Sequence, residues 1–250
     1  MRGDAIVAPL TISVRLTPEQ HQLILDQTGR RISAIPYESA APAVRCHFGG
    51  IPLHIARGVF VPAAATERLL DMAVLAASTF PRPTIVDVGT GCGAVALAAA
   101  KALPHAAVFA TDTSELALET ARANRRRLKL RNVRFARGSL LAPLPRRLTS
   151  KVAVVVANVP YVPPRLADAF KAAFPEGTAI GPGEDGLDLV RELASGAREY
   201  LIRGGFLVLQ LAGFQWTTLA AELLALGYAA PELQEQSGNA PVVGRVAWPS

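Results

Sequence analysis

The sequence predicts an α/β protein with a doubly wound, mostly parallel sheet of seven strands, and three observations support this fold class. Helical and strand-like patterns alternate from residue 66 onward. A glycine-rich loop at residues 87–93 joins a buried strand pattern to a helical one. Residues 228–248 hold two strand-like runs without a helix between them, which predicts a terminal antiparallel hairpin.

The spacing of apolar residues separates the expected helices from the expected strands. Ahead of the terminal hairpin, the expected strands are residues 84–88, 107–111, 133–136, 152–157 and 206–211. The expected helices are residues 67–79, the alanine-rich stretch from the glycine loop to about residue 103, and residues 114–128, 187–201 and 215–226.

The beginning of the chain has a different pattern. A strand is expected at residues 11–15, and Thr17, Pro18 and Gln20 form a helix start, with a capping residue, a first-turn proline and a capping box. That helix is expected to end near Gly29. Residues 33–42 carry two prolines and small polar residues, which predicts a linker.

Residues 44–61 alternate apolar and polar residues around two glycines, which indicates a β-hairpin placed to cover a site. We therefore expect three parts of the chain. These are an N-terminal extension acting as a lid or a homodimerisation arm (1–45), a substrate-side β-hairpin (46–65) and a cofactor-binding catalytic domain (66–250).

Length and composition predict a protein with one main core. The chain has 250 residues and is 50% hydrophobic, which is enough to bury a sizeable core. Its two cysteines, Cys46 and Cys92, and its four histidines have no metal-ligand spacing, so we expect neither a metal site nor a disulfide framework. No apolar run reaches the roughly 18 residues that cross a bilayer, so a cytoplasmic protein is expected.

The formal net charge of +6 is concentrated in one basic stretch at residues 122–137. Such a stretch can attract an acidic partner or nucleic acid. Only four lysines occur in the chain, so arginine is its ordinary basic residue, and a helix face in contact with water is the simpler interpretation.

A strand, then Gly-x-Gly-x-Gly, then a helix is an arrangement that lets backbone approach a ligand closely. Nicotinamide, flavin and S-adenosylmethionine cofactors all use loops of this kind. Asp112 ends the next strand and lies about 20 residues after the loop, where a carboxylate can accept hydrogen bonds from ribose hydroxyls. A carboxylate at a helix N-terminus is the alternative interpretation of Asp112.

The run Asn158-Val159-Pro160-Tyr161 follows the buried strand at 152–157 and therefore lies at the carboxyl edge of the sheet, where ligands bind. The side-chain oxygen of Asn158 and the carbonyl of Val159 can each accept one N–H of a planar NH2 group. Tyr161 can pack against the plane of that group. An ordinary proline turn is the alternative interpretation.

Several segments together resemble the N5-glutamine methyltransferases that modify peptide-chain release factors. The similar segments are residues 87–93, 111–114 and 158–161, with further agreement at 47–53, 59–62, 66–67 and 183–188. The resemblance implies a class I methyltransferase fold. It also implies S-adenosylmethionine as cofactor, S-adenosylhomocysteine as product, and a glutamine-containing protein loop as partner.

The resemblance and the motifs together give the candidate site residues. Those for the cofactor are Asp87, Gly89, Thr90, Gly91, Gly93, Asp112, Thr113, Ser139, Leu140 and Asn158. Those for catalysis are Asn158, Val159, Pro160 and Tyr161, and those for the substrate are Phe60, Pro62, Tyr161 and His54.

The chain departs from the family pattern in four places. Val159 replaces the first proline of Asn-Pro-Pro-Tyr, which keeps the carbonyl and frees the backbone. Residues 63–65 are three alanines in place of an Arg-Pro-acidic run, which removes polar contacts near the substrate. Ser139 replaces an aspartate, which weakens the implied contact to the adenine amino group. Residues 1–45 are shorter than, and unlike, the family's N-terminal helical domain.

The leading hypothesis is N-methylation of an amide or other planar amino group, on a protein glutamine or a mimic of one. The alternative is N-, C- or O-methylation of a small molecule in natural-product biosynthesis, which the short N-terminus, the apolar residues 63–65 and Phe60 favour. An adenine-N6 nucleic-acid methyltransferase ranks last, because the basic stretch is distant in sequence from Asn158.

Overall fold

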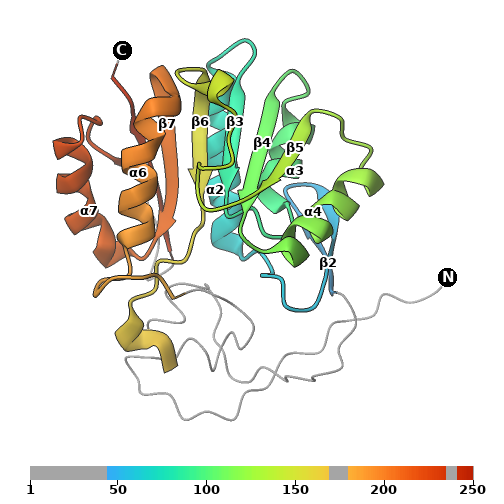
Figure 1. The fold of residues 1–250 in the computed structure, drawn as a ribbon, viewed down its shortest axis with the longest axis horizontal. Coiled ribbons are helices and arrows are strands. Elements are labelled where there is room, and N and C mark those ends of the chain that lie inside the picture. The colour runs from blue at the N-terminus through green and yellow to red at the C-terminus, as the bar shows by residue number, and fades with distance from the viewer. Residues whose placement is uncertain (1–43, 169–179, 235–240, 250) are drawn as a thin grey trace.

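The computed structural model describes residues 44–168, 180–234 and 241–249. The strand, helix and linker expected before residue 43 lie outside the described residues, as does the turn expected around residues 237–240. Figure 1 shows the described elements as layers around one sheet.

The main sheet has seven strands in the order β5-β4-β3-β6-β7-β9-β8, which confirms the predicted fold class. Strands β5, β4, β3, β6 and β7 are parallel to one another. Strand β9 is antiparallel to both β7 and β8, in agreement with the antiparallel hairpin predicted from residues 228–248. The strands are β3 (Thr84–Val88), β4 (Ala107–Asp112), β5 (Val133–Arg137), β6 (Val152–Ala157), β7 (Leu201–Leu211), β8 (Glu232–Leu233) and β9 (Val242–Ala247).

Each helix predicted after residue 66 is present, with small shifts at its ends. The helices are α2 (Ala64–Ser78), α3 (Ala94–Ala102), α4 (Glu115–Arg127), α6 (Asp188–Tyr200) and α7 (Gly213–Ala225), with short 3-10 turns η1 (Arg146–Leu148) and η2 (Pro164–Leu166). Helix α2 begins three residues earlier than the periodicity indicated, because alanines continue the helix back to an extended Ala63.

Strand β7 begins at Leu201, not at residue 206 as predicted, because the Gly204-Gly205 pair lies inside the strand and does not end it. The N–H of Gly204 donates to the Trp248 carbonyl, and the N–H of Trp248 donates to the Gly205 carbonyl. A Cβ at Gly205 would lie 2.9–3.1 Å from three backbone oxygens. The glycines therefore allow a close strand approach that a larger residue would prevent.

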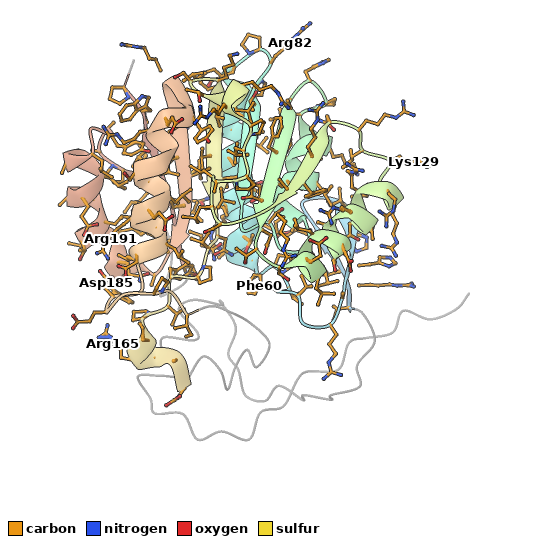
Figure 2. The ribbon with its side chains drawn as sticks, in the orientation of Figure 1. Phe60, Arg82, Lys129, Arg165, Asp185 and Arg191 are labelled. Carbon is orange, nitrogen blue, oxygen red and sulfur yellow. The ribbon has the colours of Figure 1, made fainter. Side chains whose placement is uncertain are left out.

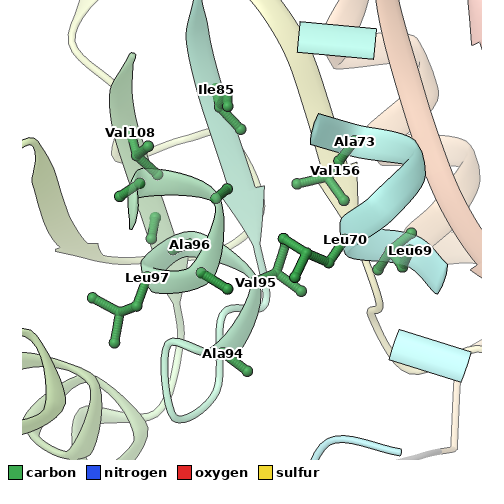
Figure 3. Close-up of a cluster of buried hydrophobic side chains, with 14 of the residues drawn as sticks. Leu69, Leu70, Ala73, Ile85, Ala94, Val95, Ala96, Leu97, Val108 and Val156 are labelled. Atoms are coloured by element: carbon green, nitrogen blue, oxygen red, sulfur yellow. The ribbon is translucent and has the colours of Figure 1, made fainter. Parts of the chain in front are cut away.

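Two hydrophobic clusters cover the two faces of the sheet. One contains buried residues of α6 and α7, and the other contains buried residues of α2 and α3. Strand β6 is buried along its whole length, as expected for a central parallel strand with helices on both faces. Figure 3 shows the second cluster, where Leu70 of α2 and Val95 of α3 approach the sheet beside Val156.

A hairpin forms from β1 (Val44–Phe48) and β2 (Ile51–Ile55), joined by Gly49 and Gly50 at φ 52° and 73°, and it is shorter than the predicted range 44–61. Its buried side chains belong to the same cluster as α2 and α3, so it shares the core of the main domain. The buried side-chain amide of Asn124 on α4 accepts from the N–H of His54 at 3.0 Å and donates to its carbonyl at 2.9 Å. The hairpin is therefore held against α4.

The basic stretch lies on the outer side of α4 and in the turn after it. Arg126, Arg127, Lys129 and Arg131 are exposed, whereas Arg125 donates to the Val133 carbonyl. Figure 2 shows Lys129 at the periphery of the molecule. In the described ranges, no helix has the length and apolar character that crossing a bilayer requires.

Candidate functional site

Three loops meet at the carboxyl edge of the sheet. Strand β3 lies between β4 and β6 and is parallel to both, so the loops that follow these strands are adjacent. The glycine loop follows β3, Asp112 ends β4, and Asn158 follows β6. Figure 2 shows Phe60 at the end of the molecule opposite Arg82, which precedes β3 and marks the amino edge. The glycine loop, Asp112 and the run that begins at Asn158 thus lie at one edge of the sheet.

Asp87 holds the glycine loop in shape from below. Its Oδ2 atom accepts from the Thr90 hydroxyl at 2.6 Å and from the Ala96 N–H at 3.0 Å. The side chain is only 3% exposed, and this burial raises its pKa to about 6. These contacts make Asp87 a positioning residue for the loop and for the start of α3.

The three glycines of the loop have positive φ angles, but for different reasons. A Cβ at Gly93 (φ 85°) would lie 2.9 Å from Leu97 and 3.0 Å from Ala121, so this glycine permits close packing of α3 and α4. A Cβ at Gly91 (φ 56°) would meet nothing within 4 Å. The open space of the loop therefore lies over Gly91.

Asp112 connects the glycine loop to the end of β4. Its Oδ2 accepts from the Gly91 N–H at 2.8 Å, and its Oδ1 accepts from the Ser114 N–H at 2.9 Å. The side chain is half-buried. Because two carboxylate oxygens offer about four acceptor positions, two remain for a ligand. Asp112 therefore precedes a helix that Ser114 caps and keeps acceptor capacity, and its contact with ribose hydroxyls stays a prediction.

The run from Asn158 to Tyr161, the acceptor motif, lies directly against the glycine loop. A Cβ built on Gly89 would lie 3.3 Å from Cγ1 of Val159 and 4.0 Å from the Asn158 carbonyl oxygen. Asn158 is half-buried, and its Nδ2 donates to the Thr66 hydroxyl at 3.5 Å. Its Oδ1 accepts no hydrogen bond from the described residues, so the acceptor end of this amide remains available.

Val159 and Tyr161 anchor the acceptor motif in the core. Val159 is 6% exposed and Tyr161 is 7% exposed, and both belong to the cluster beneath α6 and α7. The Tyr161 hydroxyl accepts from Nε2 of Gln210 at 3.3 Å, and burial raises its pKa to about 12. Little of the Tyr161 ring faces outward, so its contacts are those of an anchor.

The remaining cofactor candidates surround the end of β5. Thr113 and Ser139 are exposed. Leu140 has a positive φ of 46°, and its carbonyl accepts from the Thr111 hydroxyl at 2.7 Å. This bond ties the turn after β5 to β4 and leaves the Ser139 hydroxyl at the surface.

The substrate candidates lie in two different places. Phe60 is 40% exposed and Pro62 is half-buried, in the segment that leads into α2 and to Thr66. His54 lies beside α4. Its pKa is lowered mainly by burial and, to a smaller extent, by the nearby charges of Arg127 and Arg45. The structure therefore brings the Phe60 segment toward Asn158 and places His54 with the basic helix.

Sequence reasoning missed the residues that support the acceptor motif. Thr66 contacts Asn158, Gln210 contacts the Tyr161 hydroxyl, and Gln215 contacts the Tyr161 carbonyl. The two glutamines carried a signal, since both are buried polar residues in or beside an apolar strand end. Their partners lie 49 and 54 residues away, and local patterns do not reveal contacts at that separation.

Comparison with known proteins agrees with this geometry. A family profile described as a methyltransferase domain matches residues 85–175. A methyltransferase structure from Pyrococcus furiosus superposes with a TM-score of 0.59 at 19% identity, over 80% of this chain and 90% of that one. The fold and the matched methyltransferase profile identify an S-adenosylmethionine-dependent methyltransferase of class I.

Relatives of known function narrow this class. The chain is 36% identical to the release factor glutamine methyltransferase of Deinococcus radiodurans, over 89% of this chain and 78% of that protein. It is 37% identical to the one of Gloeobacter violaceus, over 72% of this chain and 63% of that protein. The protein belongs to the release factor glutamine methyltransferase family. These relatives support the glutamine hypothesis and give no support to natural-product biosynthesis.

Proposed function

We propose that this protein methylates the side-chain amide nitrogen of a glutamine in a peptide-chain release factor, with S-adenosylmethionine as the methyl donor. The observation that carries the proposal is the contact between the glycine loop and the acceptor motif, where a Cβ on Gly89 would lie 3.3 Å from Val159. A donor held by the loop and an acceptor held by Asn158 would therefore be neighbours.

The residues at the loop suit S-adenosylmethionine. Gly91 presents backbone with open space above it, and no side chain of the loop fills that space. Asp112 lies beside Gly91 with acceptor capacity left for the two ribose hydroxyls. Ser139 and Leu140, in the turn after β5, would adjoin the adenine, and Asp87 would act indirectly by holding Thr90 in place.

When bound, S-adenosylmethionine supplies an activated methyl group on sulfur. The chain's own contribution is to hold the acceptor nitrogen in line with that group. Oδ1 of Asn158 and the Val159 carbonyl would each accept one N–H of the acceptor amide. An amide nitrogen is a poor nucleophile because its lone pair is delocalised, and fixing both N–H groups favours the orientation that exposes the lone pair. The nitrogen becomes positive as it takes the methyl group from sulfur, and one of its two protons is then lost to solvent.

Thr66 would set the orientation of Asn158. Because the Thr66 hydroxyl accepts from Nδ2, the Oδ1 atom would be left to face the acceptor. Burial holds Val159 in place where the family has a proline, so packing replaces ring rigidity. Phe60 and Pro62, in the segment before α2, would form an apolar wall for the stem of the glutamine side chain.

The test compares wild-type protein with the Asn158→Ala variant, using a purified bacterial release factor and labelled S-adenosylmethionine. We expect kcat to fall by about 100-fold or more, as when a transition-state hydrogen-bonding group is removed. The Kd of S-adenosylhomocysteine, measured by calorimetry, should stay within about 3-fold of wild type, because Asn158 mainly serves the acceptor.

Tandem mass spectrometry of the product locates the methyl group. A methyl on a glutamine side chain supports the proposal. A methyl on lysine or arginine, or wild-type turnover by Asn158→Ala, would overturn it.

A further inference from the structure

The most completely bonded polar side chain near the acceptor motif is one that the proposed chemistry does not use. Gln215 lies in the first turn of α7 and is 2% exposed. Its Oε1 accepts from the Ala212 N–H at 3.1 Å. Its Nε2 donates to the Tyr161 carbonyl at 2.7 Å and to the Asp185 carbonyl at 2.9 Å. Both N–H groups and the oxygen of the amide are thus engaged.

These bonds join three segments that are distant in sequence. Ala212 is the residue at which β7 passes into α7, Asp185 belongs to the loop before α6, and Tyr161 ends the acceptor motif. Gln215 lies 54 residues from Tyr161 and 30 from Asp185. One side chain therefore fixes the motif relative to both the strand end and the loop.

The loop before α6 leaves the acceptor motif no room on that side. A Cβ at Gly186 would lie 2.4 Å from the Tyr161 carbonyl oxygen, and a Cβ at Gly181 would lie 2.8 Å from the Pro160 carbonyl oxygen. The Gly181 N–H also donates to the Val162 carbonyl at 2.9 Å. The backbone on the C-terminal side of Val159 is therefore enclosed by direct contact.

The loop itself is tied to α7 through charge. Arg191 contacts Asp185 at 2.6 Å and Glu222 of α7 at 2.8 Å. Figure 2 shows Asp185 and Arg191 together at the carboxyl edge of the sheet. The loop before α6 is thus anchored by contacts that do not involve Gln215. Because Gln215 bonds both this loop and Tyr161, it fixes the position of Tyr161 relative to the loop.

We propose that Gln215 is a positioning residue for the methyl acceptor, holding the motif backbone so that the Val159 carbonyl lies where an acceptor N–H can reach it. This inference rests on the proposed function of Asn158 and Val159. Among the described residues, Gln215 forms no hydrogen bond with the glycine loop. Its loss should therefore change acceptor alignment and leave cofactor binding unchanged.

The first test is Gln215→Met, which keeps the length of the side chain and removes both donors. Because small misplacements at a reacting centre cost large rate factors, we expect kcat with a release factor to fall by about 100-fold. The Kd of S-adenosylhomocysteine should remain within about 3-fold of wild type, which also shows that the variant is folded.

Asn132→Ala is the matched control. Asn132 is also a side-chain amide that donates to carbonyls, at 3.1 Å to Ala100 and 3.2 Å to Ala106, but it lies at the start of β5 on the amino edge. We expect its kcat to stay within about 3-fold of wild type, since distant sites act independently. Equal kcat losses in Asn132→Ala and Gln215→Met would overturn the proposal.

A second variant separates positioning from helix capping. Gln215→Glu retains an oxygen for the Ala212 N–H and lacks the amide donors to Tyr161 and Asp185. At a pH where this carboxyl is ionised, we expect the kcat loss of Gln215→Met to be reproduced. Wild-type kcat in Gln215→Glu would show that only the cap matters and would overturn the inference.

The Asn158→Ala variant, measured in parallel, separates the two proposals. Full activity in Asn158→Ala removes the proposed acceptor site itself. Loss of activity in Asn158→Ala with full activity in Gln215→Met leaves that site intact and rejects only the role of Gln215.

Discussion

The two halves of the proposed site, the glycine loop for the methyl donor and the acceptor motif, are built differently. The glycine loop is held by short-range bonds: Thr90 to Asp87 over 3 residues, Ala96 to Asp87 over 9, and Gly91 to Asp112 over 21. The acceptor motif is held by long-range bonds, over 92 residues to Thr66 and 54 residues to Gln215. The conformation of the glycine loop, on the methyl-donor side, therefore depends on two neighbouring strands. The conformation of the acceptor motif, on the methyl-acceptor side, depends on contacts across the whole domain.

This difference has a mechanical meaning. Strand β3 pairs with β4 and β6 in the central sheet, so we expect the loop that follows it to belong to the most stable region. The acceptor motif needs α2, α7 and the loop before α6 to be in place. Substitutions that weaken distant packing should therefore reduce acceptor alignment before they reduce cofactor binding.

The largest expected effect concerns the buried carboxyl beneath the glycine loop. Its pKa is raised from 3.8 to about 6, so the folded protein binds more protons than the unfolded chain between these values, and stability falls as the pH rises through this window. We expect Asp87→Asn to remove up to about 3 kcal/mol of that pH dependence.

Urea unfolding of wild type and Asp87→Asn at several pH values between about 4 and 7 measures the effect. The difference in unfolding free energy between the two proteins should change across the window and level off above it. A difference that is constant with pH would show that Asp87 has an ordinary pKa and that the loop is not held as described.

The second effect should be confined to the donor side. Asp112→Asn keeps one oxygen for a backbone N–H and removes the charge proposed to bind ribose hydroxyls. Hydrogen bonds to a charged group contribute about 2 kcal/mol, so we expect S-adenosylhomocysteine affinity to fall about 30-fold. The KM for the release factor, measured at saturating S-adenosylmethionine, should be unchanged. A rise of about 30-fold in that KM would contradict the idea that the glycine loop and the acceptor motif act separately.

A pair of glycine substitutions gives the third and smaller effect. Gly91→Ala and Gly50→Ala both place a Cβ in open space at positive φ, so their backbone strain should be similar, about 1 kcal/mol each. Only Gly91 lies in the proposed cofactor site, and we expect its variant alone to bind S-adenosylhomocysteine about 10-fold more weakly. Calorimetry measures the S-adenosylhomocysteine affinity of the two variants, and thermal unfolding measures their stability. Equal affinities in Gly91→Ala and Gly50→Ala would show that the cofactor does not bind at Gly91.

The smallest expected effect is on the orientation of Asn158. Thr66→Val keeps the shape of a buried residue and removes the hydroxyl that accepts from Nδ2. Because that contact is long, at 3.5 Å, we expect only about a 3-fold rise in the release-factor KM. Cofactor affinity should not change, and steady-state kinetics with calorimetry would reveal a donor-side effect if the assignment is wrong.

The same contrast explains which parts of the protein the sequence predicted. The order of elements, the glycine loop and the Asn158 run follow from periodicity and short motifs, and the sheet order confirms the fold. The predicted start of β7 was wrong because a Gly-Gly pair ordinarily signals a break in a strand. Here Gly204 and Gly205 lie inside the strand, packed against β6 and hydrogen-bonded to Trp248. The roles of Gln215 and Thr66 depend on side chains meeting across more than 50 residues, which no local pattern specifies.

Asn124 gives the small hairpin an unusual protection. A strand at the rim of a two-stranded ribbon ordinarily exposes N–H and C=O groups that can recruit another chain. Here the side-chain amide of Asn124 pairs with both groups of His54, as a third strand would, and donates to Cys92 as well. Replacement of Asn124 by an apolar residue should therefore leave the N–H and C=O groups of His54 on β2 unpaired. We expect self-association of the variant to be observed before any other defect.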